Sequence, residues 1–136
     1  MGVYLKGTYI LVVGVNKQNE IKVGSLGKIK FEKGNYAYVG SAMNSLEKRI
    51  ERHERKEKKI FWHVDYLLSS PNTKLKKVFI KPSKKKEECK TANKVANTGV
   101  PVIGFGCSDC KCKSHLFKVN KQNLLINLNG FKERWF

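Results

Sequence analysis

Apolar and polar positions along the chain predict four principal strands. Residues 8–15 (TYILVVGV) are almost continuously apolar and β-branched, which is typical of a strand covered on both faces. Alternation around Gly24 and Gly27 predicts either two short strands or one bulged strand. The predicted strand segments are residues 8–15, 21–31, 36–41 and 74–81, the last with Val78 and Ile80 on one face.

Three further segments carry apolar stripes at helical spacing. Asn44 and Glu47 have the spacing of a capping box, and Leu46 and Ile50 form a narrow apolar stripe on an otherwise charged helix. Pro82 suits the start of the third helix, since proline is common near helix starts. The predicted helices are residues 44–59, 61–68 (packed through Trp62, Tyr66 and Leu67) and 82–97.

The C-terminal third completes the predicted architecture. Residues 100–106 are rich in glycine and proline and predict a loop, whereas residues 116–119 and 124–128 predict closing strands. The order of elements predicts one α+β domain over residues 1–136, with a small, mostly antiparallel central sheet flanked by about three helices. A Cys/His loop at residues 104–115 and a short aromatic C-terminal extension complete it.

Charge changes this picture from fold to function. The chain has 28 Lys+Arg against 11 Asp+Glu, a formal charge of +17, which predicts an anionic partner such as nucleic acid. We expect no membrane partner, because no apolar run approaches the ~20 residues that a membrane span needs. Clustered cysteines without a secretory signal indicate a cytoplasmic protein with reduced or metal-bound thiols.

Several residues suit phosphate chemistry. Arg49 and His53 lie four positions apart and therefore share a helical face, where Arg49 could hold a phosphate or simply be solvated. Glu88 borders the apolar stripe of the third helix and could enter a cleft, where one carboxylate can hold Mg²⁺ beside a phosphate. Tyr9 and Tyr38 adjoin glycines that would leave their hydroxyls accessible; the alternative is two core tyrosines.

The ordered set resembles the GIY-YIG endonuclease superfamily. It consists of Gly7-Thr8-Tyr9, Tyr38-Val39-Gly40, Arg49 with His53, and a helical glutamate. The longer run YAYVGSAMNSLEKRIERH, followed by FWHVDYLL, is similar to an archaeal branch of that superfamily classed as a domain of unknown function. The resemblance covers most of the chain and implies metal-dependent hydrolysis of phosphodiester bonds.

The resemblance also implies roles for individual residues. Tyr9 would activate or orient the attacking water, Tyr38 would assist proton transfer or positioning, and Arg49 would steady the scissile phosphate. His53 would act as a general base or orienting group, and Glu88 would bind a single Mg²⁺ or Mn²⁺ ion. The alternative is a catalytically inactive nucleic-acid-binding module that kept the fold. A cleavage assay distinguishes this module from a nuclease.

We expect contacts with nucleic acid, DNA more than RNA, from a set of polar and basic residues. They are Ser41, Arg52, Arg55, Lys56, Lys84 and Lys85. The oligomeric state stays open.

His63 precedes Asp65 by two positions. We expect it to be a buried or capping histidine, and the alternative is a role at the rim of the site.

A cysteine-rich loop offers a second kind of site. Cys107, Cys110, Cys112 and His115 supply the ligand types that Zn²⁺ prefers. All four fall within nine residues, whereas zinc sites usually draw ligands from two separated segments. The alternatives are a tight loop with small buried thiols, or a wall of the substrate cleft.

Overall fold

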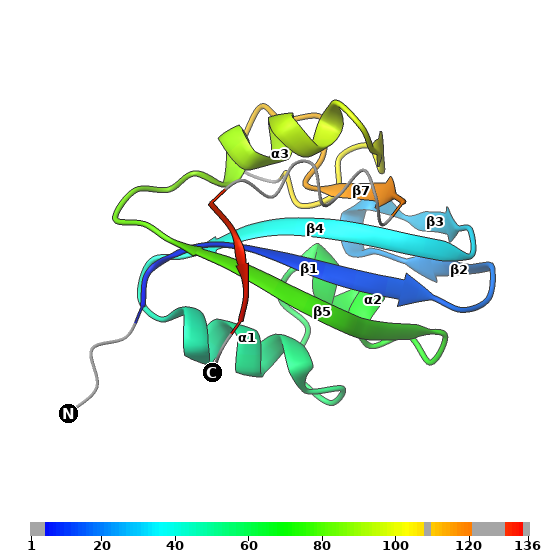
Figure 1. Ribbon diagram of the computed structural model, residues 1–136. Helices are drawn as coiled ribbons and strands as arrows, with labels where there is room; N and C mark the ends of the chain where they lie inside the picture. Colours follow the sequence, from blue (N-terminus) through cyan, green and yellow to red (C-terminus); the bar gives the residue numbers. More distant parts are fainter. Residues whose placement is uncertain (1–4, 108–109, 121–129, 135–136) are drawn as a thin grey trace.

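The computed structural model describes residues 5–107, 110–120 and 130–134, which form a six-stranded antiparallel sheet, a separate two-stranded sheet and three helices (Figure 1). The strand order of the large sheet is β6-β7-β4-β1-β5-β8. The α+β class predicted from the sequence is therefore confirmed. The elements are β1 (Gly7–Val15), β2 (Asn19–Lys22), η1 (Gly24–Leu26), β3 (Lys28–Phe31), β4 (Gly34–Ala42), α1 (Leu46–Glu54), α2 (His63–Leu68), β5 (Thr73–Pro82), α3 (Glu88–Ala96), β6 (Val100–Pro101), β7 (Leu116–Val119) and β8 (Lys132–Glu133).

Helices cover both faces of the large sheet. In Figure 1, α3 lies over one face, and α1 and α2 lie against the other. All nine residues of β1 are buried, as the apolar run predicted. Because side chains alternate along a strand, Tyr9 and Leu11 pack toward α1 and α2, whereas Ile10 and Val12 pack toward Ala92 of α3. Two hydrophobic cores therefore share one central strand.

The pairing of β4 leaves part of one sheet edge to a loop. β4 pairs with β1 along its whole length, which sets Tyr9 opposite Gly40. On its other side, β4 pairs with β7 only as far as Tyr38, opposite Leu116. The next residue, Val39, donates its N–H to the carbonyl of His115 at 2.9 Å. Past Tyr38, the edge of β4 therefore faces the Cys/His loop (residues 104–115) instead of β7.

Helix α1 is shorter than predicted. Ser45, rather than Asn44, caps it by accepting a hydrogen bond from the N–H of Lys48 at 3.1 Å. The helix ends at Glu54 instead of continuing to residue 59. Just after the helix, the Lys56 ammonium donates to the carbonyls of Leu68, the last residue of α2, and of Ser70 and Thr73. These bonds turn the chain away from the helix axis.

Helix α3 also begins later than predicted. Pro82 and the residues after it were expected to open the helix, but Pro82 is the last residue of β5, opposite Gly7 of β1. The helix starts at Glu88 and ends before Gly99, whose N–H donates to the carbonyl of Val95. Pairing with β1 therefore prevails over the preference of proline for a helix start.

The smaller elements follow the predicted pattern in part. Two short strands, β2 and β3, are joined by η1, as one of the two alternatives predicted for residues 21–31, although β2 begins at Asn19. The C-terminal extension adds β8 to the edge of β5. The predicted strand at residues 124–128 lies outside the described residues. Across the described ranges, no helix combines the length and apolar character needed to cross a membrane.

A buried carboxylate ties α1 to the start of α2. Asp65 has no exposed surface and accepts two hydrogen bonds from the Arg52 guanidinium, both at 2.8 Å. It also accepts the backbone N–H groups of Phe61 and Trp62. Burial opposes the charged form of Asp65, but these hydrogen bonds outweigh it and lower the pKa of the carboxyl. Asp65 is thus a structural residue, and α2 starts at His63 because these bonds hold the two preceding residues.

We expect Asp65→Asn to lower the free energy of unfolding by about 3 kcal/mol, since it leaves a half-buried guanidinium without its charge partner. The matched control is Glu51→Gln on the exposed side of α1, which should change it by less than about 0.5 kcal/mol. The pKa of Asp65 is lower in the folded state, so its contribution is complete above the ordinary value of 3.8 and is lost as pH falls further. Urea unfolding should therefore show the difference between wild type and variant shrinking at acid pH; a constant difference would contradict the assignment.

Candidate active site and metal centre

One cleft, with a cavity volume of about 290 Å³, brings together four of the residues singled out by the sequence. Tyr9 comes from β1, Tyr38 from β4, Arg49 from α1 and Glu88 from α3. The whole lining consists of Tyr9, Tyr38, Gly40, Ser41, Met43, Asn44, Arg49, Trp62, Lys86, Glu88 and Gly106.

The two tyrosines form the buried floor of this cleft. Tyr9 is 1% exposed and its hydroxyl is bonded to His53, as expected for a core tyrosine, whereas Tyr38 is 8% exposed and lines the cleft. Gly40 lies opposite Tyr9, and a Cβ atom there would come within 2.5 Å of the Tyr9 ring and hydroxyl. The missing side chain therefore gives space to the tyrosine itself rather than to solvent.

His53 lies directly behind Tyr9. The Tyr9 hydroxyl and His53 Nε2 are 2.8 Å apart, and His53 is 2% exposed. Burial lowers the pKa of His53 to about 3, with Lys58 adding to the effect. Burial likewise raises the pKa of Tyr9 to about 12, with Arg49 acting in the opposite direction, and raises that of Tyr38 well above its usual value. At neutral pH the pair is a protonated phenol beside a neutral imidazole.

Arg49 is held at the wall of the cleft by two contacts. One guanidinium N–H donates to the carbonyl of Ser41 at 3.0 Å, and the guanidinium carbon lies 4.4 Å from the centre of the Trp62 ring. Arg52 stacks on Trp62 at the same distance. Cation–π contacts of this kind fix an arginine without neutralising its charge. Arg49 is therefore a positioned cation in the cleft.

Glu88 and Lys86 face each other across the mouth of the cleft. Lys86 Nζ lies 3.9 Å from Glu88 Oε1, a separation too long for a strong hydrogen bond. Among the described residues that line the cleft, Glu88 is the one carboxylate. Its neighbour Glu87 pairs with Lys81 at 3.1 Å and does not line the cleft.

The residues expected to contact nucleic acid divide into two groups. Arg55, Lys84 and Lys85 are exposed, and Ser41 lines the cleft. Arg52 and Lys56 instead use their charged groups within the protein, the first on Asp65 and the second on three carbonyls. Both cations therefore already have partners within the protein, and their contact with nucleic acid stays a prediction.

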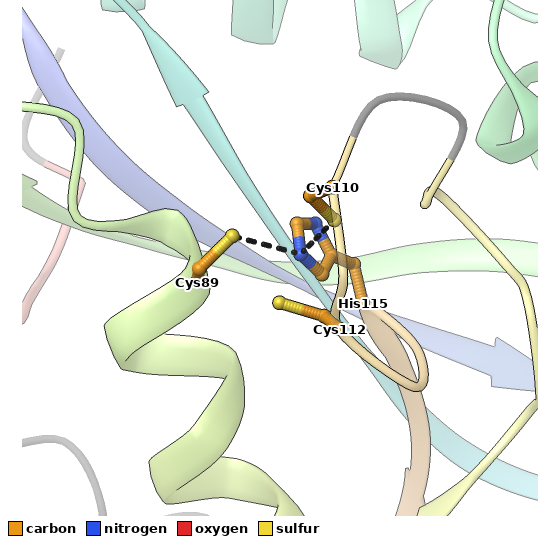
Figure 2. A group of neighbouring side chains, drawn as sticks. All are labelled: Cys89, Cys110, Cys112 and His115. Carbon is orange, nitrogen blue, oxygen red and sulfur yellow. Dashed lines mark hydrogen bonds between the residues drawn. The ribbon is translucent and has the colours of Figure 1, made fainter.

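The cysteine–histidine group, defined as Cys89, Cys110, Cys112 and His115, differs from the predicted set at one position. The ligand atoms of these four residues lie within 4.8 Å of one another, so they could hold a metal ion. Figure 2 shows Cys89 reaching from α3 toward the other three, which belong to the loop. Cys107, predicted as a ligand, instead directs its thiol to the carbonyl of Phe105. The objection that all ligands come from one short segment is thereby removed.

The loop that carries this group also reaches the cleft. Phe105 is completely buried and anchors the loop in the core. The next residue, Gly106, lines the cleft and donates its N–H to His63 Nδ1 at 2.9 Å. His63 is thus a structural acceptor that fixes the loop at the rim of the site. The expectation that the loop forms part of the cleft holds for Gly106.

Sequence reasoning missed Trp62 and Lys86 in the cleft and Cys89 in the metal group. The one sequence feature that singled out Cys89 was its place directly after Glu88, in a helix expected to border the cleft. Thiols that are distant in sequence give no spacing pattern, so only the fold pairs this cysteine with the loop.

We expect the His53 ring to remain neutral down to about pH 4. Its folded-state pKa lies below the unfolded value of 6.5, so stability falls as pH drops from 6.5 toward 3. NMR titration of the ring, assigned by comparison with His53→Gln, checks this. A midpoint near 6.5 for the His53 ring would show that it is not buried beside Tyr9.

Comparison with known proteins gave a single kind of match. The family model described as "Domain of unknown function DUF123" matches residues 8–134, which is nearly the whole chain. No curated protein and no solved structure matched. The matched region includes the cleft and the cysteine–histidine group described above. The chain therefore belongs to the DUF123 family.

Proposed function

We propose that this protein is a metal-dependent nuclease of the GIY-YIG type that hydrolyses phosphodiester bonds in nucleic acid. The observation that supports it is the convergence of Tyr9, Tyr38, Arg49 and Glu88, from four separate elements, on one cleft. A phenol, a positioned guanidinium and a carboxylate are the groups that orient water, hold phosphate and bind a divalent cation.

Arg49 binds the scissile phosphate. Its guanidinium carries N–H donors in a planar fork that matches two phosphate oxygens, and Ser41 accepts only one of them. Stacking on Trp62 keeps the fork oriented before substrate arrives. The cation then stabilises the extra negative charge that develops on the phosphate in the transition state.

Glu88 fits a hard divalent cation. A single carboxylate, completed by water and phosphate oxygens, is a common environment for Mg²⁺ and Mn²⁺. Such an ion, when bound, would polarise the phosphate and stabilise the leaving oxygen. Lys86 is near enough to Glu88 to neutralise it in the absence of a cation, and can then turn toward phosphate.

Tyr9 and His53 orient the attacking water. Because the Tyr9 phenol stays protonated at neutral pH, it acts first as a hydrogen-bonding group rather than as a base. His53 Nε2, 2.8 Å from the Tyr9 hydroxyl, orients the phenol, and the low pKa of His53 makes it an orienting group rather than a general base. Tyr38, beside Tyr9 on the floor, completes the wall against which the water is positioned.

The substrate we propose is DNA in preference to RNA, held mainly through its backbone. The net charge of +17 favours a polyanion, and the exposed Lys84 and Lys85 adjoin Lys86 at the cleft. Contacts of this kind position the backbone without reading its sequence.

A second candidate function is a nucleic-acid-binding module that is organised by zinc and does not cleave. The observation that favours it is the cysteine–histidine group, whose thiols and imidazole are the ligands that Zn²⁺ prefers. This module would bind with strong salt dependence and give no Mg²⁺-dependent product.

We expect Mg²⁺- or Mn²⁺-dependent cleavage of labelled DNA, reduced roughly 100-fold by Glu88→Gln and by Arg49→Ala, since each removes charge stabilisation of the transition state. Glu51→Gln is the control, because Glu51 lies on the exposed side of α1, outside the cleft, and should leave the rate unchanged within about twofold. Single-stranded, duplex and branched DNA and RNA should be tested. Equal loss in both glutamate variants would remove Glu88 from the site, and tight binding without cleavage in every condition would support the second candidate.

We expect the double variant Lys84→Ala/Lys85→Ala to lower the slope of log affinity against log salt by about two, one for each lost phosphate contact. Fluorescence anisotropy with labelled DNA at several salt concentrations measures this. Lys17→Ala, an exposed lysine in the turn after β1, is the matched control and should leave the slope unchanged. An unchanged slope in the double variant would place the backbone elsewhere.

A further inference from the structure

The cysteine–histidine group has the separations that a tetrahedral metal requires. Zinc–sulfur and zinc–nitrogen bonds of about 2.3 and 2.0 Å place ligand atoms about 3.6 Å apart at tetrahedral angles. His115 Nε2 lies 3.7 Å from Cys89 Sγ and 3.5 Å from Cys110 Sγ. All four ligand atoms, including Cys112 Sγ, lie within 4.8 Å of one another (Figure 2). Small inward movements of the ligand atoms would complete the coordination.

The loop side of this group is attached firmly to the sheet. His115 is 3% exposed, donates its N–H to the carbonyl of Phe105, and accepts the N–H of Val39 on β4. Val39 directly follows Tyr38, whose ring forms part of the cleft floor. The loop ligands are therefore fixed relative to the cleft by backbone hydrogen bonds.

The helix side has few other attachments. Cys89 belongs to the first turn of α3 and directly follows Glu88. Among the described residues no side chain caps this end of the helix, and the buried residues of α3, Thr91, Ala92 and Val95, begin at the end of the first turn. The first turn therefore depends on ion pairs of lysines with Glu87 and Glu88, together with Cys89. An ion bound to Cys89 would be the strongest attachment available to it.

We propose that one Zn²⁺ ion, bound by Cys89, Cys110, Cys112 and His115, fixes the first turn of α3 to the loop and so sets the position of the Glu88 carboxylate in the cleft. The zinc site stands on its own geometry, whereas the consequence for Glu88 rests on the proposed nuclease function. The four residues are positioning residues, because they act on substrate only through Glu88 and Gly106.

Metal content tests the ligand set. Protein purified without added zinc should carry about one equivalent by mass spectrometry, and Co²⁺ replacement should give the absorption of tetrahedral thiolate coordination. Cys89→Ser should carry less than about half an equivalent, whereas the matched control Cys107→Ser should keep the full amount. Zinc lost from Cys107→Ser and retained by Cys89→Ser would overturn the assignment, as would wild type without zinc. If Cys89→Ser does not fold, thiol alkylation of wild type with and without a chelator, read by peptide mass spectrometry, should show that zinc protects Cys89 and not Cys107.

Hydrogen exchange tests the attachment of α3 without any use of activity. Removing zinc from the wild type should speed amide exchange in α3 by roughly tenfold or more, and leave β1 and β4 unchanged, because only local opening is affected. Returning zinc should restore protection. Unchanged amide exchange in α3 would overturn the proposal that zinc fixes α3, even if zinc binds.

Cleavage rates then separate this proposal from the nuclease proposal. If wild type with zinc cleaves nucleic acid, removal of zinc should lower the rate toward that of Glu88→Gln, with Mg²⁺ supplied in both cases. Equal rates with and without zinc would overturn the coupling while leaving the nuclease in place. If no form cleaves, the nuclease proposal fails, and the exchange data alone decide whether zinc fixes α3.

Discussion

Burial of β1 on both faces is the constraint on which the rest of the structure depends. With every residue of this strand inside, its side chains must alternate between two cores that have different partners. Tyr9 is therefore directed toward α1, where His53 meets its hydroxyl, and its neighbours Thr8 and Ile10 face the opposite side of the sheet. A one-residue shift in register would remove the tyrosine from the cleft.

The strands were predictable because their apolar patterns are local. The run at residues 8–15 and the pair Val78 and Ile80 occupy the expected places. Only the family resemblance predicted that four residues lie in one site, namely Tyr9, Tyr38, Arg49 and Glu88. No spacing rule relates residues on four different elements. Helix boundaries failed where tertiary contacts prevailed: the ammonium of Lys56 on three carbonyls ends α1, and strand pairing retains Pro82.

The predicted metal ligands failed for a related reason. Sequence proximity favoured Cys107, but the turn at Gly104–Gly106 directs its thiol back to Phe105. Cys89 occupies the fourth place because the first turn of α3 lies beside the loop (Figure 2). The same limitation applies to charge. A composition of +17 does not show which cations have partners within the protein, as Arg52 has in Asp65 and Lys56 has in three backbone carbonyls.

The position of β1 between β4 and β5 has a consequence for the nascent chain. Residues 7–15 form an apolar strand whose second partner, β5, spans residues 73–82. At ordinary rates of synthesis, β5 follows β1 by on the order of 3–12 s. During that interval β1 can pair with β4 on one edge only, and its other edge stays open to any extended chain nearby. Ribosome-bound chains stopped before residue 73 should therefore recruit chaperones that bind extended apolar segments, and those carrying β5 outside the exit tunnel should release them.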